Sequence, residues 1–218
     1  MKIVPSIVVI LIIAGALAIL LRPRPAKAEM LKAGDLAPAI SADAVLAGQV
    51  SPIHLSDYHG RKVVLYFYPK DNTPGCTKEA CAFRDGYTKL QAAGIFVLGC
   101  SIDSADSHRS FAQKYSLPFP LLLDPDHKIA KAYGAENGIP ILGLDRRITY
   151  VIGEDGHILK VYPKVDPATH VAQIVHDLGA DQPAPVPSPS ASPAASPSPV
   201  PQPQHKSTRP SSGDNGAD

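Results

Sequence analysis

Short apolar runs alternate with segments of mixed polarity along the middle of the 218-residue chain. Continuous β-branched and aromatic stretches are typical of buried strands, and longer segments with recurring apolar positions are typical of helices. The predicted strands are residues 40–45, 50–54, 63–68, 95–101, 121–123, 148–152 and 157–162. The predicted helices are residues 76 to about 93, 104–115, 127–133 and 167–178. Gly153-Glu154-Asp155-Gly156 predicts a hairpin between the last two strands. This pattern predicts an α/β fold with a central mixed β-sheet flanked by helices.

Two segments of different composition flank this central part, which gives a predicted division into residues 1–28, 29–180 and 181–218. Residues 3–21 are almost wholly apolar, which is close to the length of a membrane span. The small residues around Ala28 offer a cleavage site, so export after cleavage is the alternative to membrane anchoring. Either reading favours the envelope side of a membrane. Residues 181–218 are rich in Pro, Ser and Ala, a composition that cannot bury a core and predicts disorder.

The charge balance excludes one large class of partner. The formal net charge is +1 and the isoelectric point is about 7.8, so the sequence gives no sign of nucleic-acid binding. The two flanking segments are apolar or rich in Pro, Ser and Ala, so the candidate reactive groups lie in the central part of the chain.

Cys76 follows the predicted strand 63–68 and begins a predicted helix, after the turn residues Pro74 and Gly75. Free backbone N–H groups and the positive end of the helix dipole meet at such a position, which lowers the pKa of a thiol. We therefore expect Cys76 to be reactive and partly exposed. Thr73 can offer its hydroxyl to the sulfur or to a substrate oxygen.

A second thiol, Cys81, follows five residues later in the same predicted helix. Cα atoms with this spacing are roughly 8–9 Å apart in a regular helix. A disulfide requires less than about 7 Å. A Cys76–Cys81 disulfide therefore requires the first turns of the helix to unwind, which is typical of a redox switch rather than of a static cross-link.

The spacing Pro69-x3-Thr73-x2-Cys76 resembles the active-site motif of peroxiredoxins. The surrounding residues, through Cys81 and Phe83-Arg84-Asp85, are similar to the peroxiredoxin Q branch, also called bacterioferritin comigratory protein. The resemblance covers about residues 31–178 and implies the peroxiredoxin type of thioredoxin-like fold.

The resemblance also implies a mechanism. Cys76 would be the peroxidatic cysteine that attacks hydrogen peroxide or an alkyl hydroperoxide, and Cys81 would be the resolving cysteine. Pro69 would shield the thiolate, Thr73 would orient the peroxide and Arg147 would stabilise charge on sulfur and oxygen. Thioredoxin or a similar dithiol protein would reduce the disulfide. The resemblance implies no metal, haem or flavin cofactor, and it implies a monomer.

Several further residues have two possible interpretations. Arg146 is expected to be solvated, whereas the spacing to Ile148 assigns the functional role to its neighbour Arg147. Cys100 ends an apolar run and is expected to be a small core residue, with an alternative resolving role as the minority reading. Glu79 and Arg84 are expected to pair with each other or to tune Cys76, or else to lie on a solvated helix face.

Two expectations concern polar residues away from the cysteines. We expect His108 to lie on the surface or to cap the helix that starts near Ser104. Asp124-Pro125-Asp126 predicts a turn before a helix rather than a cation site.

Two alternative functions remain at this stage. A membrane-anchored thiol–disulfide oxidoreductase would use the same fold but favours a Cys-x2-Cys spacing, whereas this chain has Cys-x4-Cys. A copper-binding module would need a cysteine pair with a distant histidine, and it gives no reason for Pro69 and Thr73.

Overall fold

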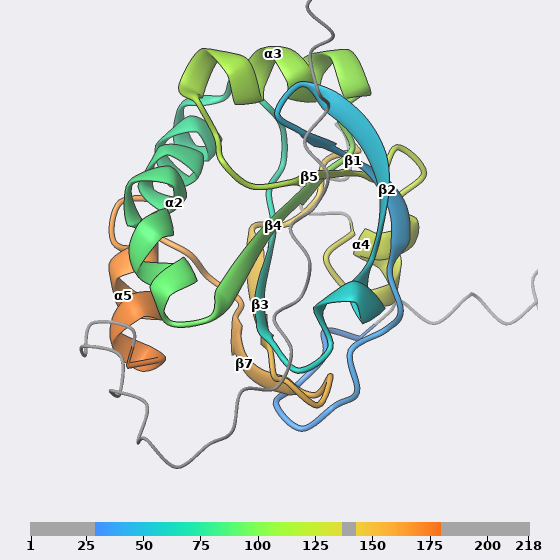
Figure 1. Cartoon of the computed structure of the whole chain (residues 1–218). Helices are drawn as coiled ribbons and strands as arrows, with labels where there is room; N and C mark the ends of the chain where they lie inside the picture. Colours follow the sequence, from blue (N-terminus) through green and yellow to red (C-terminus); the bar gives the residue numbers. More distant parts are fainter. Residues whose placement is uncertain (1–28, 137–142, 180–218) are drawn as a thin grey trace, which may run out of the picture. The chain divides into compact units, whose positions relative to one another are not determined.

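The computed structural model describes residues 29–136 and 143–179, which form one mixed sheet with helices on both faces (Figure 1). The strands run in the order β2-β1-β5-β4-β3-β6-β7. Their bounds are β1 Ser41–Leu46, β2 Gln49–His54, β3 Lys62–Phe67, β4 Ile95–Ser101, β5 Leu121–Leu123, β6 Ile148–Ile152 and β7 Ile158–Tyr162. Strands β3, β4 and β5 are parallel to one another and the other neighbours are antiparallel. The predicted α/β fold with a mixed sheet is confirmed.

The helices follow the predicted segments closely. They are α2 Pro74–Ala92, α3 Ala105–Tyr115, α4 Lys128–Ala132 and α5 His170–Asp177, with a 3-10 turn η1 at Leu55–Tyr58. At the helix starts, α5 begins at His170, three residues after the predicted residue 167, and α2 begins at Pro74, two residues before the predicted Cys76. Proline is favoured at the first helical position because it needs no N–H partner there, so the turn signal of the sequence was in fact the helix start.

The inner strand β3, between β4 and β6, is buried on both faces, and its alternate residues belong to two cores. Val64 and Tyr66 pack toward α2, α3 and α5, whereas Leu65 and Phe67 pack toward α4. Figure 1 shows α2 and α5 on one side of the sheet and α4 on the other. Successive strand residues point to opposite faces, so a continuous apolar run is what a sheet covered on both sides requires.

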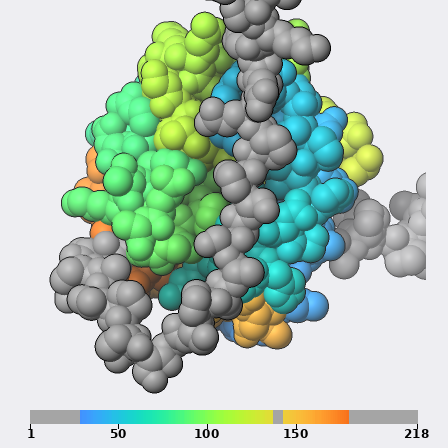
Figure 2. Space-filling model, in the orientation of Figure 1, coloured from blue at the N-terminus to red at the C-terminus, as the bar shows by residue number. Residues whose placement is uncertain are grey.

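The helices also define the visible surface of the molecule. In the same orientation, the space-filling view shows α3 at the upper left, α2 below it, and β1 and β2 on the right (Figure 2). The carboxyl end of β3 leads directly into α2, so residues 68–73 form the loop that connects the sheet to this helix.

No helix in residues 29–136 or 143–179 is long and apolar enough to cross a membrane. The predicted membrane segment 3–21, the cleavage site near Ala28 and the tail 181–218 lie outside the described residues.

Candidate active site

Cys76 lies in the first turn of α2, where the backbone N–H of Thr77 already donates to the carbonyl of Thr73 at 2.9 Å. The expectation that Cys76 is partly exposed is wrong, because only 1% of its surface is accessible. Its side chain belongs to the core between α2 and the sheet, together with Ala80 and Phe83. Access of a peroxide to this sulfur therefore depends on the loop and side chains that cover it.

Arg147 is the residue that contacts the sulfur. It precedes β6, whose first residue Ile148 pairs with Phe67 at the end of β3, so the fold brings Arg147 to the start of α2. Its Nη2 donates to Cys76 Sγ at 3.1 Å. A Cβ at Gly75 would lie 3.3 Å from the same Nη2, so the glycine permits this close approach. A guanidinium beside the sulfur favours the negative thiolate over the neutral thiol.

Glu79 holds the other side of the guanidinium, since Arg147 Nη1 donates to Glu79 Oε2. The solvated-face interpretation of Glu79 is wrong, because this side chain is fully buried. Its predicted partner Arg84 instead donates to Asp85 and to the carbonyl of Tyr115. Burial raises the pKa of Glu79 to about 7, although Arg147 opposes the shift.

The pairing of Glu79 with Arg147 was missed by the sequence analysis. Burial lowers the pKa of Arg147, but the charges of Glu79 and Cys76 more than compensate and leave it raised, so the guanidinium stays charged. The sequence nevertheless indicates that Glu79 lies on the buried face of the helix beside Cys76. The spacing i, i+3, i+4, i+7 of one helix face is found in Cys76, Glu79, Ala80 and Phe83.

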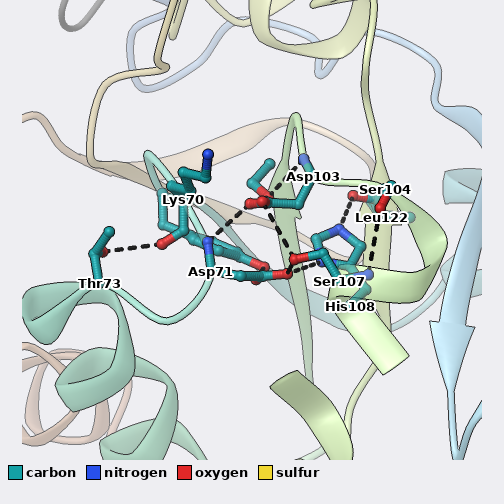
Figure 3. Close-up of polar contacts among 10 residues, drawn as sticks. Lys70, Asp71, Thr73, Asp103, Ser104, Ser107, His108 and Leu122 are labelled. Atoms are coloured by element: carbon teal, nitrogen blue, oxygen red, sulfur yellow. Dashed lines mark hydrogen bonds and ion pairs between the residues drawn. The ribbon is translucent and has the colours of Figure 1, made fainter. Parts of the chain in front are cut away.

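Thr73 and Pro69 lie in the loop before α2 and both are half-buried. The Thr73 hydroxyl donates to the carbonyl oxygen of Lys70 at 2.9 Å, rather than to the sulfur of Cys76 (Figure 3). Its proton is thereby used within the loop, and its lone pairs remain able to accept a hydrogen bond from a peroxide O–H.

Cys81 lies in the same continuous helix as Cys76 and is half-buried. Neither cysteine is part of a disulfide in the described residues. The structure thus holds the two thiols in the arrangement that the spacing predicts, in which an intact α2 separates them.

Cys100 lies at the end of β4 and is completely buried. It belongs to the core on the α4 side of the sheet, whereas Cys76 belongs to the core on the α2 side. The expectation of a small core residue is confirmed. Its position on the opposite face of the sheet argues against the minority reading as a resolving partner of Cys76.

His108 was expected at the surface or at a helix cap, and that expectation is wrong. The side chain is fully buried, and Ser104 caps α3 instead by accepting from the backbone N–H of Ser107 at 3.3 Å. His108 is buried because it shares a helix face with Phe111 and Ala112, at i+3 and i+4.

Asp124 precedes α4 and binds its first turn, so the predicted turn before a helix is confirmed. Its carboxylate accepts from the backbone N–H groups of Ile129 and Ala130 at 3.0 and 2.8 Å. Within residues 29–136 and 143–179, no group of three or more His, Cys, Asp or Glu side chains is arranged to hold a metal ion, so the copper-binding alternative gains no support.

Comparisons with known proteins agree with this geometry. Residues 33–161 match the AhpC/TSA family. The chain is 50% identical over 128 residues to a putative peroxiredoxin bcp of Coxiella burnetii, covering 56% of this chain and 84% of the relative. It is 41% identical over 131 residues to peroxiredoxin Bcp of Bacillus subtilis, covering 58% and 83%.

Solved structures give the same result. A PrxQ mutant from Xylella fastidiosa matches with a TM-score of 0.64 and 32% identity, covering 70% of this chain and 98% of the other. Peroxidoxin BcpB of Mycobacterium tuberculosis matches with a TM-score of 0.63 and 30% identity, covering 71% and 99%. The chain therefore belongs to the AhpC/TSA family, as a peroxiredoxin of the Q or Bcp type, and is a thiol-dependent peroxidase.

Proposed function

We propose that Cys76 is the peroxidatic cysteine of this peroxidase and that Cys81 resolves it. The observation that carries the proposal is the 3.1 Å contact between Arg147 Nη2 and Cys76 Sγ at the start of α2. A buried sulfur with a guanidinium beside it and a helix N-terminus behind it is suited to attack an oxygen atom.

In the first step, the Cys76 thiolate attacks the terminal oxygen of hydrogen peroxide or an alkyl hydroperoxide. An S–O bond forms, the O–O bond breaks, and the leaving oxygen takes up a proton and departs as water or an alcohol. Arg147 stabilises the negative charge as it moves from sulfur to oxygen. Pro69 excludes water from the sulfur, and Thr73 accepts a hydrogen bond from the peroxide.

In the second step, α2 unwinds at its first turns and the Cys81 thiol attacks the sulfenic acid. A Cys76–Cys81 disulfide forms and one water molecule leaves. A dithiol protein of the thioredoxin type then reduces the disulfide by exchange and becomes oxidised itself.

The first test is stopped-flow mixing of the reduced full-length protein with hydrogen peroxide, followed by mass spectrometry of the product. We expect rapid oxidation to a Cys76–Cys81 disulfide. Oxidation no faster than that of an ordinary free thiol would contradict the assignment of Cys76.

The resolving role is tested with Cys81→Ser. This variant should consume one equivalent of peroxide, fail to recycle with thioredoxin and over-oxidise at Cys76, because the sulfenic acid has no partner thiol. Full recycling in this variant would transfer the resolving role to an external thiol.

We also propose that residues 3–21 place the enzyme at a membrane, or direct its export, with the catalytic domain on the envelope side. The apolar length of this segment supports the proposal. Cell fractionation with alkaline extraction tests it: recovery of the whole chain in the cytosol would contradict both forms of the proposal. The monomeric state is tested by sedimentation of the purified protein.

A further inference from the structure

The loop between β3 and α2 has an unusual conformation for a segment that carries two site residues. Asn72 has φ 59°, in the left-handed region, and the hydroxyl of Thr73 closes the turn onto the carbonyl of Lys70 at 2.9 Å. Asparagine tolerates this region better than most residues, but a left-handed non-glycine residue still costs about 1 kcal/mol. Such a conformation persists only where neighbouring groups fix it.

Asp71 is the residue through which the loop is fixed, and it is 95% buried, with 5% of its surface exposed. Its backbone N–H donates to Asp103 Oδ2 at 2.8 Å. Its carboxylate accepts three hydrogen bonds, from Tyr68 Oη at 2.8 Å, Ser107 Oγ at 2.8 Å and His108 Nδ1 at 2.9 Å (Figure 3). The loop is thus attached to the end of β4 and to α3, which lie far from it in the sequence.

His108 links this carboxylate to the neighbouring strand β5. Its Nε2 lies 3.2 Å from the carbonyl oxygen of Leu122, which can only accept, so Nε2 carries a hydrogen. Burial raises the pKa of Tyr68 well above its ordinary value, so that hydroxyl keeps its proton and donates to Asp71. Nδ1 of the His108 ring lies 2.9 Å from Asp71 Oδ2, so the imidazole connects the loop to β5 through a buried contact at each ring nitrogen.

None of these hydrogen bonds reaches Cys76, Arg147 or Glu79. The network therefore holds the loop and has no direct hydrogen bond to the sulfur or to its two charged neighbours. Asp71 stands two residues from Pro69 on one side and two residues from Thr73 on the other. A small rotation at Asp71 would move both residues relative to the sulfur.

We propose that Asp71, held by the buried side chain of His108, is a positioning residue that sets the loop carrying Pro69 and Thr73 for attack on the peroxide. The proposal rests on the proposed peroxidatic role of Cys76. It assigns to α3 and to the carboxyl end of β4 a part in peroxide reduction, although the described residues of neither element have a hydrogen bond to the sulfur.

The test compares two reactions of Cys76 in the full-length protein. One is oxidation by hydrogen peroxide, which depends on how the loop orients the peroxide. The other is alkylation by iodoacetamide, followed at Cys76 by mass spectrometry, which depends on the thiolate and its accessibility but not on that orientation. The variants are Asp71→Asn, which keeps the shape of the side chain, and His108→Gln, which removes the imidazole that holds the carboxylate.

The chain offers a matched control in a second histidine–aspartate pair. His127 Nδ1 lies 2.8 Å from Asp145 Oδ1, close to the 2.9 Å that separates His108 Nδ1 from Asp71 Oδ2. The His127–Asp145 pair lies at the start of α4, on the other side of the sheet. His127→Gln breaks this part-buried pair and so measures the general effect of losing a histidine–aspartate contact.

We expect Asp71→Asn and His108→Gln to lower the rate constant for peroxide by about tenfold to a hundredfold, since small misplacements of reacting groups have effects of this size. Their alkylation rates should stay at or above that of the wild type, and His127→Gln should match the wild type in both reactions. If either main variant does not fold, Ser107→Ala removes one donor and should still slow peroxide oxidation by about threefold.

Three results would overturn the proposal: wild-type peroxide rates in the variants, equal losses in both reactions, or an equal peroxide loss in His127→Gln. Slow oxidation of the wild-type protein itself would be a different failure, because it would contradict the role of Cys76 and not that of the network.

Discussion

Cys76 and Cys100 are both almost inaccessible, with 1% and 0% of their surfaces exposed, yet their surroundings are opposite. Cys76 has the guanidinium of Arg147 at 3.1 Å. Burial raises the pKa of Cys100 well above its ordinary value, and the nearby carboxylates of Asp124 and Asp145 raise it further. The comparison teaches that burial alone does not decide whether a thiol reacts. We expect the sign of the nearest charge to decide it, because a buried charge is screened weakly.

The largest expected effect comes from removing the thiol of Cys76, the proposed peroxidatic cysteine. Cys76→Ser should reduce peroxide consumption to the rate of buffer alone, because a serine hydroxyl at this site is not ionised and does not attack the O–O bond. A coupled assay with thioredoxin and its reductase measures this loss, and circular dichroism verifies that the variant is folded. Residual turnover would mean that Cys81 or Cys100 reacts with peroxide directly.

Removing the cation beside Cys76 tests whether the nearby charge distinguishes Cys76 from Cys100. Arg147→Gln should lower the rate constant for hydrogen peroxide by about a hundredfold, the usual cost of losing one donor that stabilises developing charge. Arg146→Gln is the matched control, because it removes the adjacent positive charge without touching the sulfur. Equal effects of the two substitutions would show that only the net charge matters.

Glu79 connects this site to the stability of the fold. Its pKa is raised from an ordinary value of 4.5 to about 7 by burial, so between these values the folded protein holds a proton that the unfolded chain has released. The free energy of unfolding should therefore fall as the pH rises through this range and become level above it. In Glu79→Gln this loss should be smaller, by on the order of 2 kcal/mol.

Urea unfolding of both proteins at about pH 5 and about pH 8 measures this difference. Other titrating groups contribute equally to both proteins and cancel in the comparison. An identical pH dependence in wild type and variant would mean that Arg147 keeps Glu79 ionised in the folded state throughout.

The smallest effect on activity is expected at Cys100. Cys100→Ser should leave the peroxidase rate unchanged and lower the free energy of unfolding by about 1–3 kcal/mol, because it buries a hydroxyl in an apolar core. Peroxidase assays and urea unfolding measure the two quantities. A slower recycling step in this variant would restore Cys100 as a partner of the reactive cysteine.

Local sequence patterns predicted the strands to within one or two residues, because the apolar runs are continuous and the turns between them carry Gly, Pro or Asp. The burial of Cys76, Glu79 and His108 was missed, although each lies on an apolar helix face. Chemical type alone predicts exposure of these residues, whereas their place in the helical repeat predicts burial.

The contacts of Asp71 could not have been predicted from spacing. Its partners Asp103 and His108 lie 32 and 37 positions further along the chain, and they reach Asp71 only because β3 and β4 are parallel neighbours. Long-range polar networks of this kind depend on the register of the sheet, for which the sequence carries no local signal.

One unbroken helix, α2, carries both Cys76 and Cys81. This arrangement limits the peroxide concentration that the enzyme can withstand without over-oxidation. In the proposed cycle, a sulfenic acid at Cys76 waits for the helix to open before Cys81 can reach it. A second peroxide molecule competes during that delay and yields the irreversible sulfinic acid. The opening rate of α2 therefore determines the peroxide concentration above which the enzyme becomes over-oxidised. A helix that opens more slowly would make the enzyme inactivate at a lower peroxide concentration.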